Sequence, residues 1–156
     1  MAWSNSKIFR AFIADVLDNT TAIDLGADTP KVSLHNNSIT PDQNVTSANS
    51  AYNAGVWTTT NEVTSSGQWA SGGVALSSKS LDSGTSAVVF YDAADTASGS
   101  TATLSSVYGC LVYDDTLTTP VADQGLCYNY FGGSQSVTSG TFTVIWHSNG
   151  IFRISL

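Results

Sequence analysis

The sequence predicts a mainly β protein, an antiparallel β-sandwich of jelly-roll-like type with one N-terminal helix. Ser and Thr supply 42 of the 156 residues, whereas Asp, Glu, Lys and Arg supply only 17, so hydroxyl groups and backbone must coat much of the surface. Short stretches of alternating apolar residues, separated by Gly, Asn, Asp and Ser, are typical of strands joined by turns. The length favours a single domain over residues 1–156.

One segment near the N-terminus has helical periodicity instead. Apolar residues recur there at intervals of three and four, which predicts a helix from Ser6 as N-cap to Leu17, stopped by Asp18-Asn19. This apolar surface is wider than one helix face needs to bury on a small sandwich, so we expect residues 1–19 to lie at an interface in a homo-oligomer, with a trimer favoured. The expected interface residues are Trp3, Ile8, Phe9, Phe12 and Ile13.

Strand patterns and turn residues fill most of the remaining chain. Alternation or short apolar runs predict strands at residues 31–35, 56–63, 74–76, 86–91, 104–113 and 126–131. Clusters of Gly and Ser at residues 67–73, 98–100 and 132–139 are short enough to be loops. Residues 45–54 carry a weaker helical pattern that predicts a short helical turn.

The C-terminal segment predicts a closing hairpin. Asn149-Gly150 is a dipeptide favoured in tight hairpin turns, because both residues tolerate positive φ. Before it, Phe142, Val144 and Trp146 share one face of a strand, and after it Phe152 and Ile154 share another. We expect Trp146 and Phe152 to be buried in the core.

Charge and hydropathy restrict the partners. The net charge is −7 and the five basic residues are scattered, so nucleic acid is not an expected partner. No apolar run approaches the ~20 residues that span a bilayer, and the N-terminus lacks the layout of a signal peptide. We therefore expect the protein to be made in the cytoplasm and not to have a membrane as a partner.

Cys110 and Cys127 flank a predicted loop at residues 114–123. If the adjoining strands pair across this loop, the two cysteines lie opposite each other or nearly so, and a disulfide is geometrically allowed. Thiols in the cytoplasm normally stay reduced, which favours two free, buried cysteines.

Reactive side chains form no recognisable catalytic motif. His35 and His147 lie at predicted strand ends without a nucleophile elbow, where a surface or strand-edge role is expected, and Glu62 has no second Glu for glycoside chemistry. The cysteines and histidines lack the close spacing of a zinc site. Acidic residues at loop ends could suggest calcium, but turn formation explains them better; they are Asp92, Asp95, Asp114, Asp115 and Asp123. The sequence thus predicts neither an enzyme nor a metal or cofactor site.

Two tryptophans leave one binding function open. Exposed aromatic residues on β-sandwich modules often stack against sugars, and Trp57 and Trp69 are the two whose positions are ambiguous. A carbohydrate-binding module with these residues as its platform is therefore the alternative from another functional class.

Several stretches resemble small proteins encoded by tailed bacteriophages. They are Thr29-Pro-Lys-Val-Ser-Leu-His35 with Ile39-Thr-Pro41-Asp-Gln43, Val107-Tyr-Gly-Cys-Leu-Val-Tyr113-Asp-Asp, Asn129-Tyr-Phe-Gly-Gly133 and Gly140-Thr-Phe-Thr-Val-Ile-Trp146. The opening Trp3-Ser-Asn-Ser-Lys-Ile-Phe-Arg is similar to the start of such proteins in phages of actinobacteria. The matching residues belong to strands and turns, and none is catalytic.

The resemblance implies a virion structural protein. It suggests a capsid decoration (cement) or minor capsid protein that binds the major capsid lattice, with residues 1–19 at an oligomer or capsid interface. A tail-associated structural protein, or a carbohydrate-binding module for adhesion to the host surface, is the alternative. In either case the chain would be made in the host cytoplasm and end in the virion.

Overall fold

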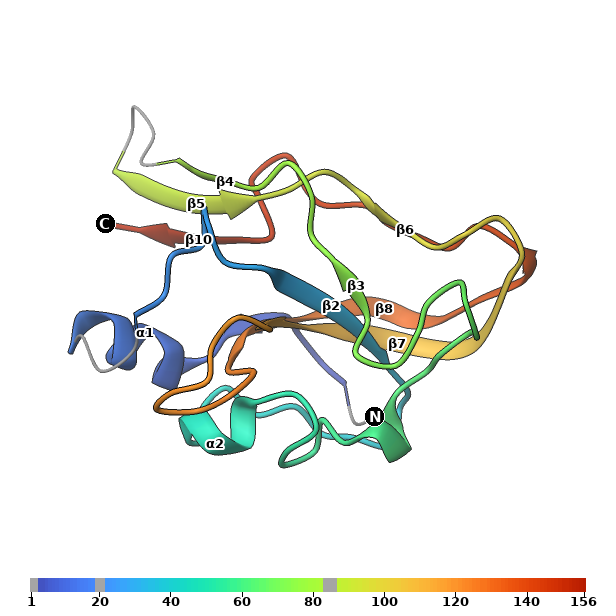
Figure 1. Ribbon diagram of the computed structural model, residues 1–156, viewed down its shortest axis with the longest axis horizontal. Helices are drawn as coiled ribbons and strands as arrows, with labels where there is room; N and C mark the ends of the chain where they lie inside the picture. The colour runs from blue at the N-terminus through green and yellow to red at the C-terminus, as the bar shows by residue number, and fades with distance from the viewer. Residues whose placement is uncertain (1–2, 19–21, 83–86) are drawn as a thin grey trace.

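The computed structural model describes residues 3–18, 22–82 and 87–156 and arranges antiparallel sheets in two layers (Figure 1). One layer is a five-stranded sheet in the order β1 (Lys7–Ile8), β8 (Gly125–Gly140), β7 (Ala102–Asp114), β2 (Pro30–His35) and β3 (Val74–Ala75). The other contains β10 (Phe152–Ser155), β5 (Val88–Asp92) and β4 (Ser80–Asp82), followed by the pair β6 (Thr96–Ala97) and β9 (Thr143–Val144). The mainly β, antiparallel fold class expected from the sequence is confirmed.

The helices lie outside these two layers. Helix α1 (Arg10–Leu17) sits at one end of the molecule near β10, and α2 (Ser47–Ser50) lies on the face of the five-stranded sheet that points away from the second layer (Figure 1). The strand predicted at residues 56–63 is wrong, because this segment contains the 3-10 turn Thr59–Asn61 and only an isolated bridge from Glu62 to His35. The short helical turn predicted within residues 45–54 is confirmed as α2.

A single long ribbon contributes to both layers. The chain from β5 to β7 pairs with the chain from β8 to β10, so that Val88 is opposite Ser155 at one end and Tyr113 is opposite Gly125 at the other. Residues 115–124 join the two arms at the tip. The ribbon folds over between β6 and β7, where β8 also passes into β9, and its halves therefore face each other (Figure 1).

The predicted closing hairpin is wrong, although the turn itself exists. Gly150 has φ of 89° and its N–H donates to the His147 carbonyl at 2.7 Å. The flanking strands, however, pair with β6 and β5 rather than with each other. The turn lies in the loop between β9 and β10, which interrupts the pairing of the long ribbon. At the start of this loop, the Trp146 N–H donates to the Asp95 carboxylate at 3.0 Å. A local turn signal cannot say which strand pairs with which.

Two further expectations about elements are wrong. The helix begins at Arg10 rather than after Ser6, because Lys7 and Ile8 pair with β8 and the Phe9 N–H donates to the Leu126 carbonyl at 3.0 Å. Residues 132–139 are part of β8 rather than a loop. Of the predicted boundaries, Asn19 at the helix stop and Ser86 at the start of a strand lie outside the described residues.

Each face of the five-stranded sheet carries a core of its own. The face toward α2 packs rings, namely Trp3, Phe9, His35, Trp57 and Tyr128. Side chains alternate along a strand, so the neighbouring positions point into the sandwich; these are Val32, Leu34, Cys110, Val112 and Cys127, all buried. We call the first group the aromatic core and the second the sandwich core.

Candidate binding surface

His35 is a core residue and not the surface or strand-edge residue that the sequence predicted. Its exposed fraction is 0%, its Nε2 lies 3.0 Å from the Ser33 hydroxyl oxygen, and its ring contacts Trp57 edge to face. Burial lowers the pKa of His35 to about 3, which outweighs a backbone hydrogen bond at Asn61. The imidazole is therefore neutral at physiological pH and has no path to a substrate.

The two cysteines are free, buried and unreactive. Cys110 is opposite Asn129 and Cys127 is opposite Val112, so the two sit diagonally on one face of the sheet rather than directly across from each other. Burial raises the pKa of the Cys127 thiol to about 12, against a hydrogen bond from Asn129 that lowers it. A thiol in this state is not a nucleophile at neutral pH.

The acidic residues act mainly as turn formers and in local contacts. Asp114 accepts a hydrogen bond from the Thr116 N–H at 2.9 Å, and Asp115 forms an ion pair with Lys31 at 2.7 Å. Burial raises the pKa of Asp114 to about 6, the Thr116 N–H opposes this shift, and the nearby Asp28 carboxyl adds to it. No group of three or more His, Cys, Asp or Glu side chains that could hold a metal ion occurs in residues 3–18, 22–82 and 87–156.

Glu62 fastens two loops together. It accepts hydrogen bonds from the Tyr52 hydroxyl at 2.9 Å, the Ser71 hydroxyl at 2.7 Å and the Gly72 N–H at 2.9 Å. The Tyr52 ring in turn stacks on Tyr113, with ring centroids 4.8 Å apart. Each contact of Glu62 is with the protein's own loops, so its role is structural.

The expected sugar platform is not formed, because both indoles are inside the protein. Trp57 is 1% exposed and Trp69 is 0% exposed, and Trp69 packs edge to face on Phe142. Neither can present a ring face to a sugar. The sequence pattern could not reveal this, because residues 36–73 form few regular strands and their burial depends on how they cover the sheet.

Most of the expected interface residues are also part of the core. Trp3 and Phe9 are 0% exposed and Phe12 is buried, whereas Ile8 and Ile13 are partly buried. Trp3 closes the aromatic core and donates from its indole N–H to the Asn36 carbonyl at 2.8 Å. The interface predicted for Trp3, Phe9 and Phe12 is therefore wrong for a folded protomer, because these side chains are already covered.

A different apolar surface remains open at the end of the molecule. A groove of about 570 Å³ separates α1 from the inner face of β10, β5 and β4. We call it the end groove; its apolar lining is Phe12, Ile13, Val16, Ile23, Leu25, Leu81, Val89, Phe152 and Ile154. Leu81 on its rim is 56% exposed, and Leu17 at the end of α1 is 82% exposed. The expected interface residues include Phe12 and Ile13 of this lining but not Val16 or Leu81, and Leu81 lies on a strand far from the helix in sequence.

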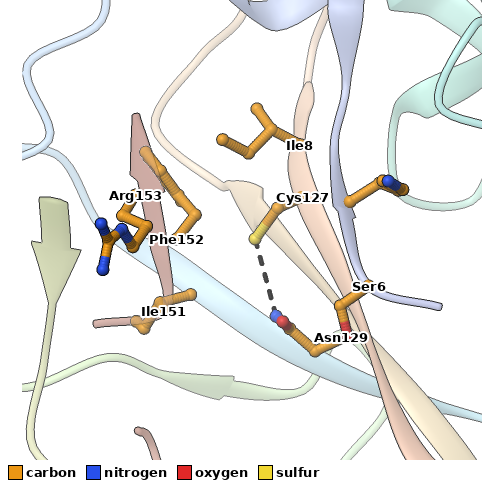
Figure 2. A pocket seen from close by; sticks show the side chains of 8 residues that line it. Ser6, Ile8, Cys127, Asn129, Ile151, Phe152 and Arg153 are labelled. Carbon is orange, nitrogen blue, oxygen red and sulfur yellow. Dashed lines mark hydrogen bonds between the residues drawn. The ribbon is translucent and has the colours of Figure 1, made fainter. Parts of the chain in front are cut away.

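A smaller cavity opens along one side, between the two layers. It measures about 270 Å³ and is lined by Ser6, Lys7, Ile8, Cys127, Asn129, Ile151, Phe152 and Arg153. Figure 2 shows this seam cavity, with Cys127 and Asn129 on one side and Ile151, Phe152 and Arg153 on the other. The Asn129 amide donates to the Cys127 sulfur at 3.7 Å.

Comparisons with protein-family models, with curated proteins and with solved structures gave no significant match to this chain. Within the described residues, no helix has the length and apolar character to cross a membrane.

Proposed function

We propose that this chain is a structural protein of a tailed-bacteriophage virion, and that it decorates the capsid by binding the head lattice. The resemblance of its strand and turn segments to such phage proteins supports this role. The described residues offer binding surfaces rather than reactive groups, since His35, Cys110 and Cys127 are buried away from solvent. A role near the tail is the second candidate on the same grounds.

The end groove is the observation that carries the proposal. The largest contiguous apolar patch on a protein surface is often a binding site. Here Val16 and Leu81 lie on opposite walls of one groove, with exposed fractions of 45% and 56%. Phe12 anchors the α1 wall by packing on Phe152 at a ring distance of 5.8 Å. The groove is therefore held open by the fold and suits a permanent partner such as a capsid lattice.

The exposed end of α1 supports an oligomer contact as part of the same proposal. Val16 on the groove wall and the neighbouring Leu17 are the exposed apolar residues of the helix, whereas Trp3, Phe9 and Phe12 are buried. We expect a homo-oligomer, with a trimer favoured, formed by the free protein or on the lattice. If the free protein forms this contact, light scattering should show an oligomer for wild type and a monomer for Leu17→Asp. A wild-type protein that is monomeric at every concentration, and that also contacts no second copy on the particle, would contradict the contact.

Particle incorporation tests the function. Leu81→Asp places a charge on the groove rim at an exposed position, so the fold should survive while binding to the lattice is lost. Ile145→Asp is the matched control, because Ile145 is 75% exposed and lies outside the groove. We expect virions purified from the phage to contain wild type and Ile145→Asp but not Leu81→Asp, with the protein located on the head by electron cryomicroscopy. Absence of the wild-type protein from particles would refute the proposal, and density at the tail would favour the second candidate.

A further inference from the structure

The side of the sandwich that holds the seam cavity is bounded by two strand edges. In the five-stranded sheet, the short strand β1 pairs with β8 at Cys127 and Tyr128, and the flanking Phe9 and Ser6 bond to Leu126 and Tyr130. In the other layer, β10 is the outermost strand, because it pairs with β5 and with no further strand among the described residues. The cavity lies between these edges, as Figure 2 shows for Ile8 on one side and Phe152 on the other.

The outer edge of β10 offers backbone hydrogen-bonding groups. The Leu156 N–H donates to the Ala87 carbonyl at 2.8 Å, which fixes the phase of the antiparallel ladder. Hydrogen-bonded pairs alternate along such a ladder, so Phe152 and Ile154 bond to β5, whereas the N–H and C=O of Arg153 and Ser155 point away from it. Such an edge is a template for one more strand.

The cavity beside this edge suits an apolar side chain. Ile8, Ile151 and Phe152 contribute hydrocarbon to its walls. Cys127 adds a thiol that stays protonated, because burial raises its pKa to about 12. The rest of the lining is polar, with Ser6 and Asn129 uncharged and Lys7 and Arg153 cationic, so the cavity combines an apolar wall with positive charge.

The outward-pointing position next to the cavity is basic. Arg153 is exposed, and its guanidinium lies 3.4 Å from the Ser155 hydroxyl. Within the part of the chain that the structure describes, no carboxylate comes within ion-pair distance of Arg153, although the whole chain has a net charge of −7. This cation is therefore available to an acidic group on a partner.

We propose that β10 accepts an extended segment of a partner protein as an added strand, with an apolar side chain in the seam cavity and an adjacent acidic side chain against Arg153. Adjacent residues of a strand point to opposite faces, which is why the two side chains must be neighbours in the partner sequence. The identification of the partner as a virion protein rests on the proposed function. The binding mode rests on the edge, the cavity and Arg153 alone.

The test uses the isolated full-length protein and a synthetic probe. The probe is the blocked heptapeptide Thr-Val-Asp-Val-Thr-Val-Thr, which alternates apolar and polar residues and has one Asp. Titrated into ¹⁵N-labelled protein, it should shift the amide signals of Arg153 and Ser155 in a saturable manner. The same peptide with N-methyl groups on alternate amides removes the donors that an added strand needs, and should bind at least about tenfold more weakly.

A charge exchange tests the role of Arg153. Replacing Asp by Lys in the peptide should weaken binding roughly two- to fivefold, the range for exposed ion pairs, and Arg153→Glu should do the same with the Asp peptide. The Lys peptide should recover its affinity with Arg153→Glu, which a purely structural role of Arg153 would not produce. Equal affinities for both peptides, or no saturable shift with either, would overturn the proposal.

A blocking variant tests the cavity. Asn129→Phe should fill it and abolish peptide binding, while Thr138→Phe, at an exposed position on the same strand, should leave binding unchanged. Thermal unfolding of both variants checks the fold, and binding by a folded Asn129→Phe protein would also overturn the proposal. These measurements need no virion. A failed peptide titration would therefore contradict the binding mode, whereas failed incorporation into particles would contradict the proposed function.

Discussion

The two faces of the five-stranded sheet are covered by different kinds of side chain. On the aromatic side, rings of Trp3, Phe9, Trp57 and Tyr128 meet at centroid distances of 5.4–6.1 Å. On the sandwich side, aliphatic residues and two thiols face β5 and β10, a carboxyl group is buried at Asp114, and the end groove and the seam cavity open. One side is closed by ring packing, and the other remains able to admit a partner.

This difference separates stability from binding. Rings packed edge to face gain free energy beyond the area they bury, and they hold the loops at residues 36–73 on the sheet. The sandwich side carries the open surfaces, which are concentrated around β10. We therefore expect substitutions on the aromatic side to unfold the protein, and substitutions around β10 to change binding with small effects on stability.

Removal of the central ring should have the largest effect. Trp57 contacts Trp3, Phe9, His35 and Tyr128, so Trp57→Ala would leave a cavity in the middle of the aromatic core. We expect the free energy of unfolding to fall by about 3–5 kcal/mol. Urea denaturation followed by circular dichroism measures it. A loss below about 1 kcal/mol would mean that the aromatic side is not the stabilising one.

Acid should destabilise the protein through the aromatic side. The pKa of His35 is about 3 in the folded protein against 6.5 in the unfolded chain, so only the unfolded chain takes up a proton between these values. Stability is then lost as the pH falls below 6.5, by on the order of 3 kcal/mol at pH 4. His35→Gln should flatten this dependence in unfolding measurements from pH 4 to 7. If the free energy of unfolding of wild type rose relative to that of His35→Gln as the pH fell, the lowered pKa of His35 would be contradicted.

Gly109 tests how tightly Trp3 is packed. A Cβ at this position would lie 2.4 Å from the Asn129 carbonyl oxygen and 2.6 Å from the Trp3 ring. Gly109→Ala should therefore cost about 2–3 kcal/mol through overpacking. Gly140→Ala is the matched control on the same ribbon, where the nearest contact is the Val137 methyl at 3.0 Å. Equal thermal stability of the two variants would show that the aromatic core can move to make room.

The sandwich side should respond to pH with the opposite sign and a smaller effect. The pKa of Asp114 is about 6 in the folded protein against 3.8 in the unfolded chain, so the folded protein retains a proton as the pH rises between these values. The full shift corresponds to about 3 kcal/mol, and solvent screening reduces the expected loss of stability over that window to about 1–2 kcal/mol, which persists at higher pH. Asp114→Asn should remove this loss, so the difference in unfolding free energy between variant and wild type should grow from pH 4 to 7. A constant difference would mean that Asp114 ionises normally.

The sequence predicted the strands whose signal is local. Alternation at residues 31–35 and the apolar runs at residues 86–91 and 104–113 correspond to β2, β5 and β7. Most of β2 and β7 is buried, whereas in β5 only Tyr91 is buried and the other residues are partly exposed. The Asn149-Gly150 turn was also recognised correctly as a turn. Its interpretation failed because the extra residues between β9 and β10 form an excursion, and only the partner strands β6 and β5 determine that.

The candidate surfaces were less predictable than the fold. Phe152 is buried as predicted, but the predicted burial of Trp146 is wrong, because Trp146 is only partly buried and its indole N–H donates to the Thr96 hydroxyl oxygen at 3.3 Å. The seam cavity combines β1, β8 and β10, which come from opposite ends of the chain. Burial of Trp57 and Trp69 likewise depends on loops that fold back over the sheet. Contacts between residues far apart in the sequence leave no short-range sequence pattern.

The folded-over ribbon has a consequence for the order in which the molecule assembles and opens. Pairing that starts at the tip, near Tyr113 and Gly125, closes short loops first, whereas the pair of Val88 and Ser155 closes a much longer loop. The β5–β10 end of the ribbon is then the last part to pair and the first to open. Its backbone amides should therefore exchange with solvent faster than those of the other residue pairs in the ribbon. A partner strand bound to β10 would hold β5 and β10 together, and binding would therefore slow unfolding of the whole protein.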